Sequence, residues 1–229
     1  MSELHKPTIA ILASGGGTTA EAFIRATQDG RVNAEVGLVV CSKPPEDAGI
    51  YKKIERLNTF YGLDIEAVEI SGKTHPDDSI GRGQTFAESS AICEKISEGR
   101  FGHVALMGYM RIVRGELLEE YGWNLSLSSR YQARMTNTHP GLLPETEDTH
   151  GSGASQRVID LGLSYTAHSF HLVAAGVDKG PILAEHPLLV NPEDTAQTLF
   201  DRVQDVEKAA LPYALDKFLR EQQDYYAST

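Results

Sequence analysis

The sequence predicts an α/β fold: a Rossmann-like, mostly parallel twisted sheet flanked by helices and continued by a mixed C-terminal part. Three observations lead to this prediction. Short apolar runs of strand length alternate with amphipathic helical segments through the first half of the chain. A glycine-rich break separates the first apolar run from the first helix. Two longer alternating runs in the second half are joined by a short link, which is typical of an antiparallel pair.

The first half of the chain reads as successive βαβ units. Its expected strands are residues 8–13, 34–41, 66–70 and 103–107. Its expected helices run from the glycine-rich break to about residue 29, and then over 48–57 and 86–98. The first strand runs are apolar on both sides, as in sheets that helices cover on both faces. We therefore expect parallel strands with right-handed crossovers.

The second half departs from this alternation. Its expected strands are residues 135–139, 165–173 and 181–190, and its expected helices are 153–161 and a final one from near 192–195 to about 222. Asp194 is a plausible N-cap of the final helix. The short link at 174–180 predicts that the strands on either side are antiparallel. No linker-like change of composition divides the chain, and we expect one domain over residues 1–229.

Composition restricts the classes of partner. The 229 residues carry a formal net charge of −11, which argues against a nucleic-acid-binding or anionic-membrane-binding surface. Cys41 and Cys93 are the two cysteines, and they indicate buried thiols in a reducing cytoplasm rather than a disulfide framework. The N-terminal residues lack the apolar core of a signal peptide, and no apolar run has the length of a membrane span. We therefore expect an anionic ligand to be held by local dipoles and a few cations.

The most informative segment is Asn137-Thr-His-Pro-Gly-Leu-Leu-Pro144. Side chains alternate along a strand, so Asn137 and His139 are expected on the same face. Pro140 keeps His139 out of the helical region, so the strand should end there. An amide and a titratable ring would then project from the carboxyl end of a strand, where open α/β sheets bind ligands. Taken alone, the segment fits a polar strand end before a proline turn equally well.

The glycine-rich break, Ser14-Gly-Gly-Gly-Thr-Thr19, has the form of an anion-binding loop. Glycines allow close backbone approach, and the free N–H groups at a helix start favour a phosphate. Gly15, Gly17 and Ala20 also satisfy the dinucleotide pattern G-x-G-x-x-A. That interpretation requires a carboxylate at the end of the second strand, but Cys41-Ser-Lys43 stands there. The sequence therefore favours a phosphomonoester, and a glycine turn that binds nothing is the remaining alternative.

The polar residues downstream are ambiguous by themselves. On the strand at 165–173, Ser169 and His171 share one face, and His168 takes the other, where an exposed or packing role is expected. Asp178 lies among turn formers, so a turn carboxylate bonded to its own backbone is its simplest explanation. No metal site is expected, because the chain has no H-E-x-x-H and His168 and His171 point to opposite sides. It also has no G-x-S-x-G and no setting for a nucleophilic cysteine, so an amide, an imidazole and a carboxylate remain as candidates for acyl transfer without a covalent enzyme intermediate.

Five segments, in this order and over nearly the whole chain, resemble the phosphoribosylglycinamide formyltransferase family of the formyltransferase superfamily. They are Ser14-Gly-Gly-Gly-Thr-Thr19, Leu106-Met-Gly-Tyr-Met-Arg-Ile-Val113, Asn137-Thr-His-Pro-Gly-Leu-Leu-Pro144, His171-Leu-Val-Ala-Ala-Gly-Val-Asp-Lys-Gly-Pro-Ile182 and Arg202-Val-Gln-Asp-Val-Glu207. The resemblance implies the formyltransferase fold, with a phosphate- and ribonucleotide-binding half (1–105) and a folate-binding and catalytic half (106–229). It implies no metal and no tightly bound cofactor, with 10-formyltetrahydrofolate as a co-substrate.

The resemblance also implies roles for individual residues. Asn137 would hold the formyl oxygen, His139 would act as general acid, and Asp178 would pair with His139 and favour its charged form. The implied binding residues are Gly17, Thr18 and Thr19 for the ribonucleotide phosphate, Gln204 and Glu207 for its ribose side, Met110, Arg111, Ile112 and Val113 together with Asn137 for the folate, and Arg82 as a candidate for the folate tail.

The chain departs from the family pattern at three places. Thr19 stands where the family usually has asparagine, and Thr146-Glu-Asp148 replaces a segment that usually resembles phenylalanine-proline-glycine. Residues 124–134 look like an insertion before the catalytic strand. These departures concern the packing around the substrates more than the three candidate catalytic residues.

The implied reaction transfers the formyl group of 10-formyltetrahydrofolate to the amino group of glycinamide ribonucleotide, by direct amine attack, in de novo purine biosynthesis. The alternatives are a formyltetrahydrofolate hydrolase, a formyltransferase acting on another amine, and a binding module without catalysis. The phosphate loop disfavours the hydrolase, the acidic charge disfavours a tRNA acceptor, and the complete Asn137–His139–Asp178 set disfavours the module. We expect a cytoplasmic monomer or homodimer whose partners are small-molecule substrates, with no nucleic acid and no membrane.

Overall fold

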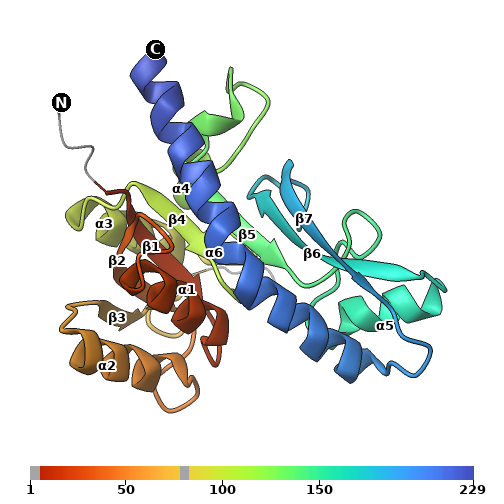
Figure 1. Cartoon of the computed structure of the whole chain (residues 1–229). Helices are drawn as coiled ribbons and strands as arrows, with labels where there is room; N and C mark the ends of the chain where they lie inside the picture. The colour runs from red at the N-terminus through yellow and green to blue at the C-terminus, as the bar shows by residue number, and fades with distance from the viewer. Residues whose placement is uncertain (1–5, 78–82) are drawn as a thin grey trace.

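The computed structural model describes residues 6–77 and 83–229, which build a seven-stranded sheet between two layers of helices (Figure 1). The strands are β1 (Thr8–Ala13), β2 (Glu35–Cys41), β3 (Glu66–Glu69), β4 (His103–Leu106), β5 (Met135–His139), β6 (Tyr165–Leu172) and β7 (Ile182–Leu189). Their order is β3-β2-β1-β4-β5-β6-β7; the first five are parallel, and β6 and β7 are antiparallel to their neighbours. The predicted α/β fold with a mixed C-terminal part is confirmed.

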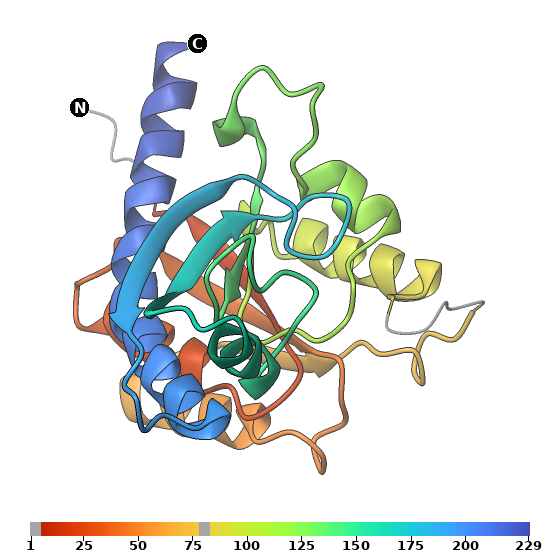
Figure 2. The same ribbon diagram turned by 90° about the vertical axis from the view of Figure 1, so that its right-hand side faces the viewer.

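Helices cover both faces of this sheet. They are α1 (Thr18–Gln28), α2 (Ile50–Tyr61), α3 (Phe86–Glu98), α4 (Gly115–Tyr121), α5 (Ser152–Asp160), α6 (Ala196–Ser228) and the 3₁₀ turn η1 (Arg130–Gln132). One apolar core joins one face of the sheet to α1, α2 and α6, and a second joins the other face to α3 and α4. Figure 2 shows α6 on one side of the sheet and α3 and α4 on the other.

The alternation of buried side chains along β1 explains this layering. Ile9 and Ile11 belong to the core under α1 and α6, whereas Ala10 and Leu12 belong to the core under α3 and α4. All four side chains are fully buried. A strand without a polar face is stable only between two helical layers, so this apolar run determines the central position of β1.

The largest difference from the sequence-based expectation concerns α6 and the segment at 124–134. This segment carries η1 and binds α6, because Gln222 Nε2 donates hydrogen bonds to the carbonyl oxygens of Tyr131 (2.7 Å) and Ala133 (2.9 Å). Tyr131 also contacts the ring of Phe218. Tyr131 also packs against the ring of Tyr225, which gives α6 a contact beyond residue 222, where the helix was expected to end; the helix continues to Ser228.

One shorter-range expectation needs correction, and one short helix was not expected. The predicted N-cap Asp194 is wrong: Thr195 caps α6, and its hydroxyl accepts from the Thr198 N–H, whereas the Asp194 carboxylate accepts from the Arg202 guanidinium. Helix α4 was not expected, because its seven residues are too few to show a clear helical period. Cys41 and Cys93 are buried and free, as expected.

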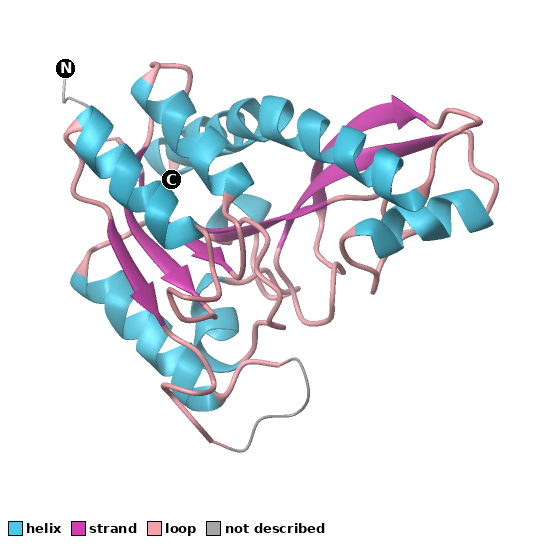
Figure 3. Ribbon diagram, turned by 90° about the horizontal axis from the view of Figure 1, so that it is seen from below, coloured by secondary structure: helices cyan, strands magenta, loops and turns pink. Residues whose placement is uncertain are grey.

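Several loops lie together at the carboxyl ends of the parallel strands, which Figure 3 shows from below. The glycine loop after β1, the segment after β4 and the proline turn after β5 all begin at this edge. The pair β6–β7 extends from the same edge, and the link between these strands returns toward β5. The topology therefore places all five sequence segments singled out above within reach of one another.

Buried histidines make the fold sensitive to acid, and His103 is one of them. His103 on β4 is 1% exposed, and its Nε2 lies 3.0 Å from Thr136 Oγ1. Burial, with a smaller contribution from the charge of Arg134, lowers the pKa of His103 from 6.5 to about 3. Between these values the unfolded chain binds a proton that the folded chain does not, so the free energy of unfolding rises with pH in this window.

We expect His103→Gln to flatten the dependence of unfolding free energy on pH between about pH 4.5 and 6. A single histidine of this kind contributes at most about 1.4 kcal/mol per pH unit there. Urea denaturation of the wild type and the variant at several pH values measures the slope. The same substitution at His75, which is only partly buried, is the matched control. Identical slopes for wild type and His103→Gln would contradict this assignment.

Candidate active site

A cavity of about 280 Å³ opens at the carboxyl edge of the sheet. Its walls come from the start of α1, the ends of β4 and β5, the loop before α5, the link between β6 and β7, and the first half of α6. Among the expected site residues, those that line it are Thr19, Met110, Arg111, Ile112, Val113, Asn137, His139, Asp178, Gln204 and Glu207. Residues more than 180 positions apart in sequence thus meet in one cavity.

Strand β5 presents Asn137 and His139 to the cavity on one face, as the alternation predicted. The register of the antiparallel pair β5–β6 sets Asn137 opposite His171 and His139 opposite Ser169. The strand ends at His139, immediately before Pro140. The prediction that a proline-stopped strand end delivers both side chains to one place is confirmed.

Asp178 lies on the link between β6 and β7, and its carboxylate faces these β5 side chains. Oδ2 lies 3.2 Å from His139 Nδ1, and Oδ1 lies 3.3 Å from Asn137 Nδ2 and 3.5 Å from His171 Nε2. The Asp178 backbone has φ 54°, a left-handed conformation that aspartate tolerates better than most residues. Asp178 is therefore more than a turn residue: it lies in a turn, and its carboxylate also contacts side chains at the ends of β5 and β6.

The ionised form of Asp178 is stabilised even though the carboxylate is buried. Its side chain is 8% exposed, and burial alone would favour the neutral acid. Hydrogen bonds from His139 and His171 outweigh that cost and hold the pKa of Asp178 well below its usual range. The carboxylate therefore stays ionised wherever the fold is intact.

His139 has an acceptor beside each ring nitrogen. Nδ1 faces the Asp178 carboxylate, and Nε2 lies 2.9 Å from Thr146 Oγ1. The Thr146 hydroxyl donates its own proton to the Leu142 carbonyl at 2.8 Å, so it accepts from Nε2–H. This arrangement accommodates the doubly protonated, charged ring. A side chain at position 141 would collide with this contact, because a Cβ there would lie 2.2 Å from Thr146 Oγ1.

Asn137 is anchored through its amide nitrogen. His171 Nδ1 donates to the Leu172 carbonyl oxygen at 2.8 Å, and its Nε2 lies 3.5 Å from Asp178 Oδ1. Asn137 Nδ2 donates to Asp178 Oδ1 at 3.3 Å and lies 3.2 Å from His171 Nε2. These contacts fix the orientation of the Asn137 amide before a ligand binds.

The glycine loop connects the cavity to the start of α1. Gly17 is the N-cap with φ 67°, and a Cβ there would lie 2.3 Å from the Ile50 side chain, so both conformation and space require glycine. No side chain caps α1, which leaves the N–H groups of its first turn for a ligand. Thr19 lines the cavity, whereas Gly17 and the exposed Thr18 lie beside it.

Thr19 also contacts the α6 side of the cavity. Its hydroxyl donates to Glu207 Oε1 at 2.9 Å. Glu207 is 5% exposed, and burial raises its pKa, although hydrogen bonds from Thr19 and Thr138 oppose this rise. Gln204 lies one helical turn earlier on the same face of α6.

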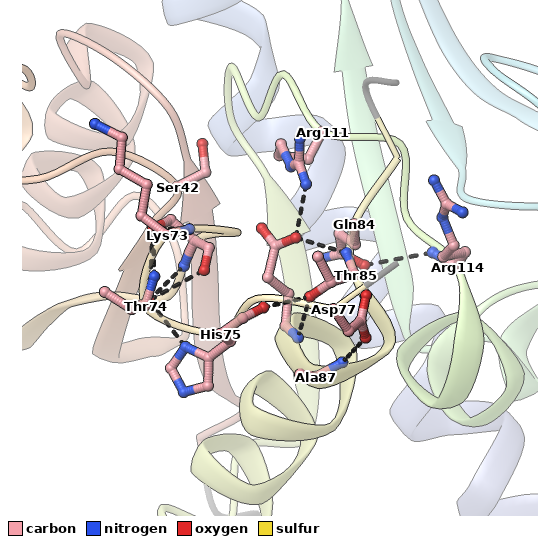
Figure 4. A network of polar contacts seen from close by, with 12 residues as sticks. Ser42, Lys73, Thr74, His75, Asp77, Gln84, Thr85, Ala87, Arg111 and Arg114 are labelled. Carbon is pink, nitrogen blue, oxygen red and sulfur yellow. Dashed lines mark hydrogen bonds and ion pairs between the residues drawn. The ribbon is translucent and has the colours of Figure 1, made fainter. Parts of the chain in front are cut away.

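The segment after β4 forms the opposite wall and is held by polar contacts. The Met110 N–H donates to Ser14 Oγ at 2.8 Å, which ties this segment to the glycine loop. Arg111 Nη2 donates to Glu88 Oε2 at 2.7 Å, and Glu88 is fully buried at the start of α3. Figure 4 shows Arg111 above the capped end of α3, near Gln84 and Thr85. The guanidinium of Arg111 is therefore fixed by the protein before any ligand binds.

Several residues of the site were given no functional role from the sequence. They are Thr138, Thr146, His171 and the loop residues Asp148, Thr149 and His150, which line the cavity or contact its polar groups. His171 could have been found from its position opposite Asn137, once antiparallel pairing of β5 and β6 was assumed. Thr146 had no such signal. The expected Arg82 lies outside the described residues.

The described part of the chain holds one cluster of possible metal ligands. Cys93, Glu116 and Glu120 come within 4.8 Å of one another on α3 and α4, away from the cavity. Burial raises the pKa of the Cys93 thiol to about 12, so that sulfur is protonated, and both carboxylates are exposed. Within residues 6–77 and 83–229, no helix combines the length and the hydropathy that crossing a bilayer requires.

Comparison with known proteins agrees with this geometry. Residues 7–215 match the family described as Formyl transferase. The phosphoribosylglycinamide formyltransferase of Bacillus subtilis (strain 168) is 28% identical over 210 residues, which cover 92% of this chain and 93% of that protein. The trifunctional purine biosynthetic protein adenosine-3 of Gallus gallus is 30% identical over 215 residues, but the match covers 93% of this chain and only 18% of that longer protein.

Solved structures give the same result. The crystal structure of phosphoribosylglycinamide formyltransferase from Bacillus halodurans superposes with a TM-score of 0.76 at 31% identity, covering 93% of this chain and 95% of the other. The glycinamide ribonucleotide transformylase 1 structure from Symbiobacterium toebii gives a TM-score of 0.78 at 27% identity, covering 96% of this chain and 90% of the other. The chain therefore belongs to the formyl transferase family.

Proposed function

We propose that the protein transfers the formyl group of 10-formyltetrahydrofolate to the amino group of glycinamide ribonucleotide, as a phosphoribosylglycinamide formyltransferase of de novo purine biosynthesis. The names of its relatives support this proposal. The observation that carries it is the convergence of Asn137, His139 and Asp178 with Thr19 and Glu207 in one cavity. An acyl-transfer set and a phosphorylated acceptor site are both required by this reaction and by few others.

The chemistry follows from the residues present. The substrate amine attacks the formyl carbon, and negative charge builds on the formyl oxygen of a tetrahedral intermediate. Asn137 and His139 are the donors proposed to stabilise that oxygen; such a preorganised donor is typically worth about 10²–10³ in rate. The amine loses a proton, the bond from carbon to the folate nitrogen breaks, and that nitrogen gains a proton. No nucleophilic side chain is needed, because the substrate supplies the amine.

Asp178 supports these steps through His139. Its ionised carboxylate accepts from Nδ1, so a positive charge on the ring is paired while Nε2 acts as general acid. In the unliganded site the His139 Nε2–H group donates a hydrogen bond to Thr146; when substrate binds, it donates to the formyl group instead. Asn137 likewise exchanges its contact with His171 for the formyl oxygen.

Binding of the two substrates is assigned to the two halves of the chain. We propose that Gly17, Thr18 and Thr19 hold the ribonucleotide phosphate, that Gln204 and Glu207 hold its ribose side, and that residues 110–113 with Asn137 line the folate site. The ribonucleotide side thus begins in residues 1–105, and the folate and catalytic side lies in 106–229. Bringing both substrates into one cavity supplies proximity and orientation.

The proposal extends to the setting of the enzyme. It has 10-formyltetrahydrofolate as a co-substrate and no tightly bound cofactor. Two buried free thiols fit a reducing cytoplasm, and the net charge of −11 fits small-molecule partners better than nucleic acid or a membrane surface. The proposed acting form is a monomer or a homodimer.

We expect formation of deformylated folate to depend on glycinamide ribonucleotide. The test incubates the protein with 10-formyltetrahydrofolate and follows the folate product with and without the amine. Equal turnover without the amine would contradict the proposal in favour of a hydrolase. Absence of turnover with every amine tried, together with folate binding, would favour a module without catalysis.

We expect Asp178→Asn to lower kcat by about 10²–10⁴, because His139 loses the charge that pairs with its protonated ring. Steady-state kinetics measures the loss, and thermal unfolding checks that the variant is folded. Asp160→Asn is the matched control, since this carboxylate is exposed on α5 away from the cavity. Activity of Asp178→Asn close to that of the control would refute the role given to Asp178.

A further inference from the structure

Thr146 is a buried polar residue beside the cavity rather than in its wall. It lies in the turn that follows the proline-stopped end of β5, and its side chain is fully buried. Its hydroxyl oxygen lies 2.9 Å from His139 Nε2 and 2.8 Å from the Leu142 carbonyl oxygen. Within residues 6–77 and 83–229, this hydroxyl is the one hydrogen-bond partner of that ring nitrogen. It is therefore placed to respond to the protonation of the ring that the proposed reaction uses.

The turn holds the hydroxyl oxygen in place. The Thr146 N–H donates to the Leu142 carbonyl oxygen at 3.0 Å, and the Thr149 N–H donates to the Thr146 carbonyl oxygen at 3.2 Å. A Cβ at Gly141 would lie 2.2 Å from Thr146 Oγ1 and 2.9 Å from His139 Nε2, so the contact has room for no side chain at that position. The oxygen is thus fixed, and the direction of its hydroxyl proton is what can still change.

The hydroxyl can pair with both protonation states of the ring. When His139 is doubly protonated, its Nε2–H donates to Thr146, and the hydroxyl proton points at the Leu142 carbonyl oxygen. When the ring has lost the Nε2 proton, the same hydroxyl can turn and donate to the bare nitrogen, because a hydroxyl accepts as well as donates. The Leu142 carbonyl then keeps the Thr146 N–H as its donor. Neither state leaves a buried polar group without a partner.

The ionisable groups around the ring act at its other nitrogen or on one another. Asp178 is ionised and lies 3.2 Å from His139 Nδ1, so the Nδ1 proton stays in place in both states. His171 lies beside the other oxygen of the same carboxylate. Glu207 on α6 accepts from Thr19. The proton that the reaction removes is therefore the one on Nε2, which faces the neutral hydroxyl.

A second buried histidine, His168 on β6, adds no charge to this exchange. Its side chain is fully buried, which excludes the exposed position that the sequence analysis allowed. Its ring nitrogens lie 2.6 Å from Thr138 Oγ1 and 3.3 Å from His186 Nδ1. Burial, with smaller contributions from neighbouring histidines, lowers the pKa of His168 to about 3. The exchange at Nε2 is thus left to His139 and Thr146.

We propose that Thr146 is a positioning residue whose hydroxyl reverses its hydrogen bond with His139 in each turnover. The inference rests on the proposed function, in which His139 is the general acid. In that step the Nε2–H bond breaks, its electron pair stays on Nε2, and the proton goes to the folate nitrogen as the bond from this nitrogen to the formyl carbon breaks. The Thr146 O–H then donates to the bare Nε2, and no proton leaves Thr146. The neutral ring is paired as soon as it forms, and it stays oriented for the next proton.

Removing the hydroxyl tests this role. Thr146→Val keeps the shape of the side chain, and we expect kcat to fall about tenfold, because the neutral ring is left with an unpaired buried nitrogen. The solvent deuterium isotope effect on kcat should rise, since proton transfer then limits the rate more strongly. The KM for glycinamide ribonucleotide should stay within about twofold of wild type, because Thr146 does not line the cavity. Thr146→Ser, which keeps the hydroxyl, should restore kcat and the isotope effect.

A matched control separates this role from a structural one. Thr136 on β5 is also buried, and its Oγ1 lies 3.0 Å from Nε2 of a buried histidine, His103, away from the cavity wall. Thr136→Val removes the same kind of contact, so it should lower thermal stability while leaving kcat and its isotope effect as in wild type. If Thr146→Val has the kinetics of Thr136→Val, the proposed role of Thr146 is wrong.

The reversal can be observed without catalysis, in substrate-free protein labelled with ¹⁵N-histidine. The Nε2 resonance of His139 is followed with rising pH until the ring is neutral, in wild type and in Thr146→Val. We expect the bare Nε2 of wild type to lie upfield of its position in the variant, because it accepts a hydrogen bond. Identical Nε2 shifts for the two neutral rings would overturn the inference. Wild-type protein that transfers no formyl group would contradict the proposed function, and these spectra would still decide whether Thr146 donates to the ring.

Discussion

The site depends on one buried carboxylate. Asp178 accepts from His139 and Asn137 at the end of β5 and lies beside His171 at the end of β6, so a single anion joins three side chains from two strands. Burial of this charge is costly unless it is hydrogen-bonded, and its partners supply those bonds. The same contacts fix the ring of His139 and the amide of Asn137 in one orientation. The chemistry proposed for the cavity therefore depends on the hydrogen bonds that compensate the buried charge of Asp178.

The fold makes that compensation possible through a change of strand direction. β1 to β5 run parallel and bring the glycine loop, the wall at 110–113 and Asn137 to one edge. β6 then pairs antiparallel with β5, and the link to β7 returns to the same edge with Asp178. Helix α6 covers this junction and adds Gln204 and Glu207. A fully parallel continuation would have required a crossover helix where this link now lies.

Local rules explain what the sequence alone predicted. Strand alternation and Pro140 were sufficient to place Asn137 and His139 side by side, and the glycine pattern was sufficient to place an uncapped helix start after β1. Asp178 stayed ambiguous, because nothing near it in sequence shows that it meets a residue 41 positions away. Thr146 and the contacts of His168 depend likewise on side chains brought together by tertiary structure. The length of α6 was underestimated because its last turns are stabilised by the segment at 124–134, a contact that no local pattern encodes.

The central claim is that the Asp178–His139–Asn137 set acts on a formyl group presented beside the ribonucleotide. A crystal structure with glycinamide ribonucleotide and a non-reactive analogue of 10-formyltetrahydrofolate tests it most directly. The account predicts the formyl oxygen within about 3 Å of Asn137 Nδ2 and His139 Nε2, with the His139–Asp178 contact intact and the amine facing the formyl carbon. A formyl group bound elsewhere in the cavity, with His139 still donating to Thr146, would contradict it.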